Sequence, residues 1–365
     1  MLRLLTLIYL LLLTACSQAS PLEKAWPNTD FAKRSISLES LRSGGPGRDG
    51  IPAIDQPHFT TPQGASSWLK PEEPVITISH QGEAKAYPLQ ILIWHEIVND
   101  RIGDTPILVT FCPLCNAALV FHRVLDGQEL SFGVSGLLRH SDMIMYDRRS
   151  ESLWQQFTGA AVIGKQLGRQ LPPFPSTITS FALFGDNYPN GQVLSRQTGH
   201  SRDYGRNPYR GYDRLGSDPF LLDDPADPRL PAMAHVLGIT LDGQQRAYNL
   251  ETLDRIGVKQ DRFMGQPLLI LSQRGLRSAL GGGRTADGRP ILQAAIYNRQ
   301  LTGHGTLSFT HQQGNVVDQQ TGSHWNLMGE AVAGPLKGER LEQLDRGVHF
   351  AFAWLVFHPR SEVVK

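Results

Sequence analysis

Two cysteines two residues apart, Cys112 and Cys115 in the segment TFCPLCNAALVFH, are the residues of this sequence best suited to chemistry. A Cys-x-x-Cys pair can chelate a soft metal, because a turn between the cysteines brings both thiolates together. It can also act as a redox pair or form a short-loop disulfide. The chain has one further cysteine, Cys16, near its N-terminus.

As a metal site, the pair supplies half of a zinc shell, so further ligands are needed. The nearest candidate is His95, in the segment WHEIVND. We therefore predict a soft-metal site for zinc or copper made by Cys112, Cys115 and His95. Met143 and Met145 could serve a cuprous ion, although their alternation in SDMIMYD is more typical of a strand that faces the core.

As a thiol site, Cys112 would act as the nucleophile or redox thiol of an enzyme. A strand precedes the pair, as in thioredoxin-like proteins, but the chain lacks the alternating βαβ pattern of that fold. The sequence contains no Gly-x-Ser-x-Gly motif, phosphate loop or dinucleotide fingerprint. The sequence therefore leaves three alternatives open for the pair: a metal site, a thiol enzyme and a structural disulfide or buried thiol pair.

The elements around the cysteines are expected to be strands. PVITISHQGEAKAYPL alternates apolar and polar residues about a Gln-Gly turn, and TPILVTF is an apolar run that leads directly into the cysteine pair. LQILIWHEIVND has helical spacing over a short stretch. We predict a mainly β protein with a few short helices, of the α+β class.

The second half of the chain repeats the pattern of the first. Tyr248 in HVLGITLDGQQRAYNL follows Tyr87 by the same interval at which Pro267 follows Pro106. This constant interval predicts an internal duplication, with a first lobe at residues 43–215, a linker at 216–231 and a second lobe at 232–365.

The predicted duplication allows the two lobes to be compared at the position of the cysteine pair. Trp325 in the second lobe matches Trp154 in the first, but Gln273 and Leu276 stand where the first lobe has its two cysteines. The second lobe is therefore expected to fold without cysteines. This favours a site that belongs to the first lobe over a structural requirement of the fold.

The N-terminus has the features of a bacterial lipoprotein signal. Residues 1–15 contain one basic residue and a short apolar run, and Leu-Thr-Ala precedes Cys16. We predict a signal peptide at 1–15, acylation of Cys16 and a polar tether at 16–42. Ser17, rather than aspartate, predicts sorting to the outer membrane, facing the periplasm, where the cell has one. The net charge of +1 indicates no nucleic-acid partner, so the membrane is the expected partner.

Six motifs, in order, resemble the DUF3179 domain family: SGGPGRDGIPAIDQPHF, AKAYPLQILIWHEIVND, VTFCPLCNAALVFHR, FGVSGLLRHSDMIMYDRRSESLWQQFTG, QTGHSRDYGRNPYRGYD and GSHWNLMGEAVAGPLKGERL. The resemblance runs from about Ser43 to Pro359. It implies an often exported family of unknown function, and it supplies no reaction.

Polar and aromatic residues gather in two of these motifs, and such side chains suit a polar ligand such as a sugar or peptide, or an envelope protein. The candidate ligand-binding residues are Arg139, Asp142, Asp147, Trp154, Gln155, Thr158, Tyr204, Asn207, Tyr209, Tyr212 and Asp213.

Overall fold

The computed structural model describes residues 21–253 and 257–365, and strands dominate these residues. The predicted mainly β fold with short helices is therefore confirmed. The signal peptide and Cys16 lie outside the described residues. The longest helices in the described part of the chain have seven residues. The helical segments are α1 (Pro21–Ala25), α2 (Pro62–Ala65), α3 (Leu89–Leu92), α4 (Phe181–Asn187), α5 (Leu250–Leu253), α6 (Ala351–Phe357) and the 3-10 turns η1 (Leu38–Ser40), η2 (Pro113–Cys115) and η3 (Thr285–Asp287).

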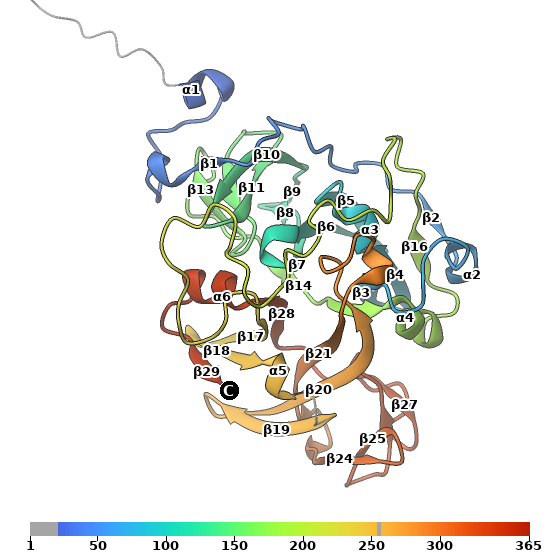
Figure 1. The fold of residues 1–365 in the computed structure, drawn as a ribbon. Coiled ribbons are helices and arrows are strands. Elements are labelled where there is room, and N and C mark those ends of the chain that lie inside the picture. The colour runs from blue at the N-terminus through green and yellow to red at the C-terminus, as the bar shows by residue number, and fades with distance from the viewer. Residues whose placement is uncertain (1–20, 254–256) are drawn as a thin grey trace, which may run out of the picture.

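The N-terminal half is built from three main sheets, which occupy the upper part of Figure 1. The first has the order β15-β3-β4-β16-β2, with β2 (Phe59–Thr60), β3 (Pro74–His80), β4 (Glu83–Pro88), β15 (Thr177–Ser180) and β16 (Gln192–Leu194). The second has the order β14-β7-β6-β5, with β5 (Ile97–Ile102), β6 (Thr105–Cys112), β7 (Ala117–His122) and β14 (Pro173–Phe174).

The third sheet of this half has the order β1-β10-β11-β12-β13. Its strands are β1 (Arg42–Ser43), β10 (Phe132–Arg139), β11 (Asp142–Asp147), β12 (Leu153–Gln155) and β13 (Ala160–Ile163). A small hairpin, β8 (Val124–Leu125) with β9 (Gln128–Glu129), precedes it. The β10–β11 hairpin and the end of β6 are the parts of the fold that build the site described below.

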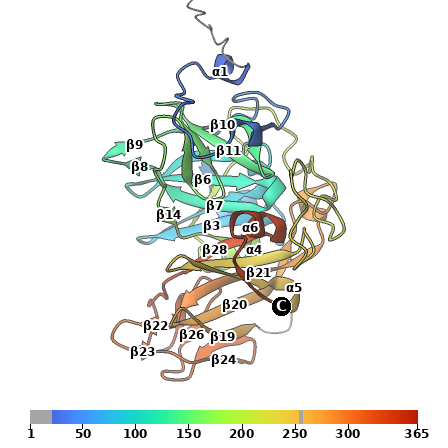
Figure 2. The ribbon, with the colours of Figure 1, turned by 90° about the vertical axis from the view of Figure 1, so that its left-hand side faces the viewer.

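The C-terminal half follows a similar order of elements and lies below the first half in Figures 1 and 2. Its sheets are β28-β17-β18-β29, β19-β20-β21, β24-β25-β26-β27 and the hairpin β22-β23. The strands are β17 (His235–Leu241), β18 (Gln244–Asn249), β19 (Val258–Phe263), β20 (Gln266–Arg277), β21 (Pro290–Asn298), β22 (Gln300–Leu301), β23 (Gly305–Thr306), β24 (Phe309–Gln312), β25 (Asn315–Asp318), β26 (His324–Trp325), β27 (Ala331–Ala333), β28 (Asp345–Phe350) and β29 (Glu362–Val364).

One large apolar core joins the two halves. It contains β6, β7 and β11 residues of the N-terminal half together with β28 and α6 residues of the C-terminal half, and it includes both cysteines of the pair. Burial of this many apolar side chains is the main favourable term in folding. The cysteine pair therefore lies in the interior of the protein and not on its surface.

Part of the segment expected to be a tether is docked on the fold. Trp26 and Phe31 are buried with Ile144 and Tyr146 of β11, and the Arg48 guanidinium lies 4.6 Å from the centre of the Trp26 ring. These aromatic side chains explain the docking, because each removes a large apolar area from water.

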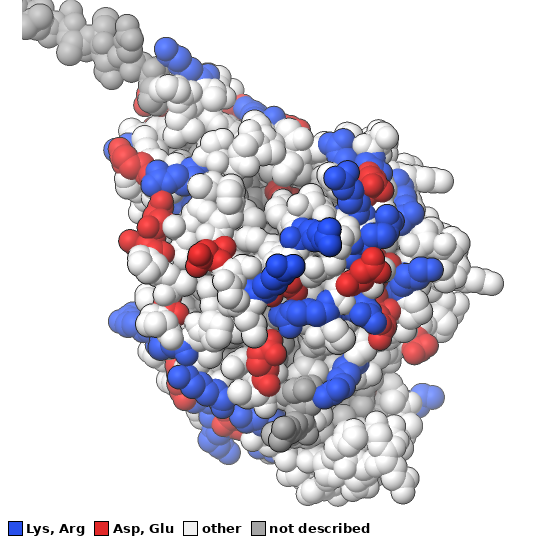
Figure 3. All heavy atoms as spheres, viewed as in Figure 1, with Lys and Arg blue, Asp and Glu red and all other residues white. Residues whose placement is uncertain are grey.

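The surface carries both signs of charge. Lys and Arg side chains are interspersed with Asp and Glu on the face shown in Figure 3. Within residues 21–253 and 257–365, no helix combines the length and the apolar composition that crossing a membrane requires.

Candidate metal centre

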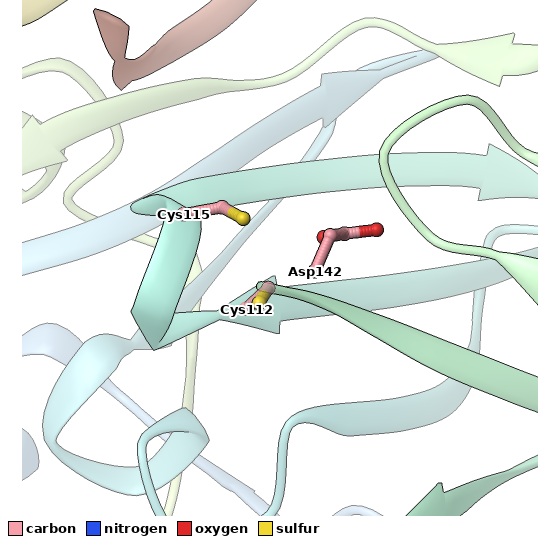
Figure 4. Close-up of side chains that lie close together, drawn as sticks. All are labelled: Cys112, Cys115 and Asp142. Carbon is pink, nitrogen blue, oxygen red and sulfur yellow. The ribbon is translucent and has the colours of Figure 1, made fainter. Parts of the chain in front are cut away.

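Three side chains that can bind a metal converge inside the N-terminal half. Cys112 is the last residue of β6, Cys115 ends the η2 turn that follows it, and Asp142 is the first residue of β11 (Figure 4). The two sulfurs and a carboxylate oxygen all lie within 4.8 Å of one another, and all three residues are buried. Both cysteines are free thiols. Cys112 and Cys115 are close in sequence, whereas Asp142 reaches them because the β10–β11 hairpin packs against the end of β6.

The sequence builds the η2 turn in a simple way. Pro113 occupies the first position of the turn, where its missing N–H costs nothing, and Asn116 ends the turn with a φ of 49°. Asparagine adopts this left-handed conformation more readily than most residues do. The turn carries the chain from β6 into β7 and directs both cysteine side chains to one side.

The hairpin that presents Asp142 has an unusual turn. Arg139 pairs with Asp142 across the hairpin, so His140 and Ser141 form a two-residue turn with φ angles of 52° and 66°. Such turns normally carry asparagine or glycine, because other residues are strained at positive φ. The turn brings the carbonyl oxygen of Ser141 to 3.8 Å from the Cys112 sulfur and 3.5 Å from that of Cys115.

Asp142 is held on one side only. Its Oδ2 accepts hydrogen bonds from the Gln155 side-chain amide at 2.6 Å and from the Phe157 backbone N–H at 2.9 Å. Its Oδ1 is buried and has no hydrogen-bond partner within residues 21–253 and 257–365. Gln155 also accepts a hydrogen bond from Arg139 at 3.3 Å. A buried carboxylate oxygen without a partner is costly, and such groups are rare in folded proteins.

The site has an excess of acidic groups. Burial raises the pKa of Asp142 to about 6, against smaller lowering effects of Gln155, the Phe157 amide and the two thiols. Burial, with a contribution from Asp142, raises the pKa of Glu96 to about 8. Burial also raises the pKa of both Cys112 and Cys115. A bound cation would reverse this balance, since it stabilises the deprotonated form of every ligand.

Two tyrosines of the predicted ligand set close the site. Burial raises the pKa of both phenols. The nearby Glu96 and Cys112 raise the pKa of Tyr209 further. The two cysteines also act to raise the pKa of Tyr212. Tyr212 also accepts a hydrogen bond from the backbone N–H of Phe220 at 3.0 Å. Both tyrosines pack against the apolar core that contains the two cysteines.

His95, the third ligand predicted from the sequence, does not belong to the cluster. Its Nδ1 lies 2.7 Å from the carbonyl oxygen of Pro52, and its Nε2 lies 2.7 Å from the hydroxyl of Tyr204. Burial lowers the pKa of the imidazole to about 4, so the ring is neutral at physiological pH. Both ring nitrogens are therefore engaged with the protein, and Asp142 takes the place expected for His95.

The other predicted ligand residues lie elsewhere. Asp147 accepts a hydrogen bond from the Trp154 indole at 3.0 Å. Asn207 binds backbone groups of its own loop and of a neighbouring loop, and Asp213 pairs with Arg289 at 3.1 Å. These contacts hold turns and loops in place. Thr158 lies on a separate cavity between the two halves.

Sequence reasoning missed two groups at the site. Glu96, directly after His95, is buried with a φ of 59°, and the carbonyl of Ser141 faces the thiols. A glutamate inside the apolar stretch LQILIWHEIV was a usable signal, because glutamate is seldom fully buried. The carbonyl of Ser141 gave no signal, since its position depends on the conformation of the hairpin.

Comparisons with known proteins identify the family but no activity. No curated protein and no solved structure shows a significant match to this chain. The family model described as "Protein of unknown function (DUF3179)" matches residues 48–361 and so covers most of the chain. The protein therefore belongs to the DUF3179 family.

Proposed function

We propose that this protein is a cell-envelope lipoprotein whose N-terminal half binds a zinc ion through Cys112, Cys115 and Asp142. One observation carries the metal assignment: two thiols and a carboxylate meet within 4.8 Å in the protein interior. One oxygen of that carboxylate has no hydrogen-bond partner among the residues that the structure describes. A buried acidic cluster of this kind is stable at neutral pH only when a cation or protons neutralise it.

The spacing of the three ligands suits tetrahedral zinc. Zinc lies about 2.3 Å from thiolate sulfur and about 2.0–2.2 Å from carboxylate oxygen, so neighbouring ligand atoms are roughly 3.5–3.8 Å apart. The Ser141 carbonyl oxygen already lies 3.8 and 3.5 Å from the two sulfurs. It would complete a shell of two sulfur and two oxygen atoms.

The surroundings of the site also suit a divalent ion. Two thiolates, one carboxylate and Zn²⁺ carry a net charge of about −1, which a nearby arginine can balance. Arg139 is near enough to Asp142 to interact with it electrostatically and is linked to it through Gln155. A carboxylate ligand favours zinc over cuprous copper, which prefers sulfur donors.

The closed surroundings support a binding or accessory role over thiol catalysis. Cys112 is 1% exposed and Cys115 is fully buried. Burial raises the pKa of Cys112, so little thiolate is present at neutral pH without a cation. A nucleophilic or redox thiol needs the opposite environment, electropositive and accessible. The alternative of a thiol enzyme that uses Cys112 therefore receives less support.

The envelope location rests on the sequence. The signal at residues 1–15 and the acylated Cys16 would attach the protein to the outer membrane, facing the periplasm, in cells that have one. The described chain begins with α1 (Pro21–Ala25) at the edge of the fold (Figure 1), where a nearby membrane attachment would not disturb the core.

We also propose that the two halves arose by internal duplication. Trp154 donates to Asp147 and Trp325 donates to Asp318, both at 3.0 Å. Each pair spans a turn between equivalent strands, β11–β12 and β25–β26. Two halves of independent origin would not be expected to share both the sequence interval and the tryptophan–aspartate contact.

A second repeated contact supports the same proposal. The Tyr87 hydroxyl donates to Asp100 at 2.6 Å, and the Tyr248 hydroxyl donates to Asp261 at 2.8 Å. The halves differ at the metal ligands, because β20 continues to Arg277 where the N-terminal half forms η2. The zinc site would then be a specialisation of one copy.

A zinc titration against a competing chelator tests the proposed site. The purified chain should bind about one zinc ion, and the double variant Cys112→Ser with Cys115→Ser should bind none. The double variant should still fold, with a loss of no more than about 1–2 kcal/mol in the metal-free state, because the thiols make only weak contacts there.

Asp104→Asn is a matched control, because Asp104 is an exposed carboxylate directly before β6, at the opposite end of that strand from Cys112. It should bind zinc like the natural protein. Zinc binding that survives in the folded cysteine double variant would overturn the assignment, and so would a natural protein that binds no zinc after reduction.

A further inference from the structure

A second site is suggested by a cavity of about 470 Å³ between the two halves of the protein. β7 and β14 line it from the N-terminal half, and β28 with α6 lines it from the C-terminal half. Cavities of this size hold small organic ligands, and interfaces between lobes are common places for them. The residues on its wall decide which ligand class fits.

One part of the wall is aromatic. Phe121, Phe157, Phe174 and Trp354 all line the cavity. Phe157 stacks on Phe357 with ring centres 4.8 Å apart and planes inclined by 17°, so its position is fixed. Such a wall favours the flat or apolar body of a ligand over a sugar with many hydroxyl groups.

Another part of the wall is basic. Arg346 and His358 line the cavity, and the described residues provide no hydrogen bond or ion pair for the Arg346 guanidinium. Its neighbour Asp345 is already occupied: it accepts hydrogen bonds from the backbone N–H groups of Ile296 and Gly347. Gln343 also donates to this carboxylate, at 3.0 Å. The cavity wall therefore holds a partly buried guanidinium that no described residue engages in a hydrogen bond or ion pair, near the His358 imidazole. Asp345, on the same wall, is near enough to interact with this guanidinium electrostatically.

Together these features define a ligand. We propose that the cavity binds a small organic anion, a carboxylate attached to an apolar and preferably aromatic body. The guanidinium of Arg346 would bind the carboxylate in a bidentate manner. Thr158, which lines the same cavity, could donate to it as well. Phe157 and Trp354 would contact the body.

This proposal is independent of the zinc proposal, although one residue belongs to both places. Phe157 lines the cavity with its ring, and its backbone N–H donates to Asp142 at 2.9 Å. The cavity itself contains neither cysteine of the metal cluster. The two proposals can therefore be tested separately.

Calorimetric titration of the purified chain with phenylacetate tests the proposal, with phenylacetamide as the neutral isostere. Phenylacetate should bind at concentrations below about 10 mM, and phenylacetamide should bind at least about tenfold more weakly, because it loses the charged hydrogen bonds. Arg346→Gln should weaken phenylacetate binding by about tenfold or more for the same reason.

Two further variants sharpen the test. Arg360→Gln removes an exposed arginine that does not line the cavity, and it should leave binding unchanged. Leu119→Trp fills the cavity while Arg346 is kept, and it should abolish binding. Equal affinity for the acid and the amide would overturn the proposal. An absence of phenylacetate binding would also overturn it. So would unchanged phenylacetate binding by a folded Arg346→Gln or Leu119→Trp variant.

Discussion

Replacing Asp142 by asparagine should stabilise the metal-free protein while it removes zinc binding. In the natural protein the carboxylate is buried, and no described residue forms a hydrogen bond with its Oδ1. An asparagine side chain keeps an oxygen to accept from Gln155 and from the Phe157 N–H. Its amide group then replaces the unpaired, charged oxygen with a neutral donor. Opposite effects on stability and metal binding are typical of a functional residue kept at a cost to the fold.

The magnitude follows from the pKa of Asp142. Burial raises this pKa from 3.8 to about 6 in the folded protein. Each pKa unit corresponds to about 1.4 kcal/mol, so the ionised carboxylate destabilises the metal-free fold by about 3 kcal/mol at neutral pH. Incomplete packing of the amide reduces the expected gain to roughly 1–3 kcal/mol.

The pH dependence of this gain has a defined sign. Below pH 3.8 the carboxyl is protonated in both the folded and the unfolded state, so Asp142→Asn should bring no gain from this source. The gain should grow as the pH rises from 3.8 and should be complete above about 6.

Urea unfolding in the presence of a chelator, at several pH values, measures this effect. Asp104→Asn serves as the control for the loss of one exposed negative charge, and its stability should change little. A metal-free Asp142→Asn protein that is less stable than the natural one at neutral pH would refute the reasoning. Retention of zinc at the natural affinity would refute it equally.

Three further predictions concern other parts of the molecule. Trp154→Phe and Trp325→Phe should each lower the free energy of unfolding in urea by about 1.5–3 kcal/mol, because each removes a hydrogen bond to a buried aspartate. A loss of stability in only one of the two variants would contradict equivalent roles for the two tryptophans. Burial lowers the pKa of His349 from 6.5 to about 3. Between these two pH values the unfolded state binds more protons at His349 than the folded state does. The free energy of unfolding should therefore fall as the pH decreases from 6.5, by up to about 1.4 kcal/mol per pH unit. His349→Gln should flatten this slope, and an unchanged slope would exclude the residue as its source. Cys16→Ser should release the folded protein from membranes, and membrane association that persists in high salt would contradict lipid attachment.

Much of the fold could be predicted from the sequence because strand signals are local. Alternating residues in PVITISHQGEAKAYPL and the apolar run TPILVTF correspond to β3, β4 and β6. The docking of Trp26 onto β11 was not predicted, because the surrounding segment is polar and its partner lies more than a hundred residues away. Local composition indicates which segments form strands, whereas it says little about which surfaces meet.

The candidate site shows the same limit. The sequence gives Cys112 and Cys115 as a chelating pair, because two residues in a turn bring the side chains together without any help from the rest of the fold. It favoured His95 by residue type, but the fold commits both ring nitrogens of His95 to other partners. Asp142 was predicted as a ligand-binding residue, yet its approach to the cysteines depends on the long-range packing of the β10–β11 hairpin.

The most direct test of the zinc assignment is X-ray absorption at the zinc edge on the metal-loaded protein. The proposed site predicts two sulfur atoms at about 2.3 Å and two oxygen atoms at about 2.0–2.2 Å from the metal. In Asp142→Asn the zinc signal should be lost. A spectrum with no sulfur in the shell, or with imidazole nitrogen in place of carboxylate oxygen, would contradict a site made by Cys112, Cys115 and Asp142.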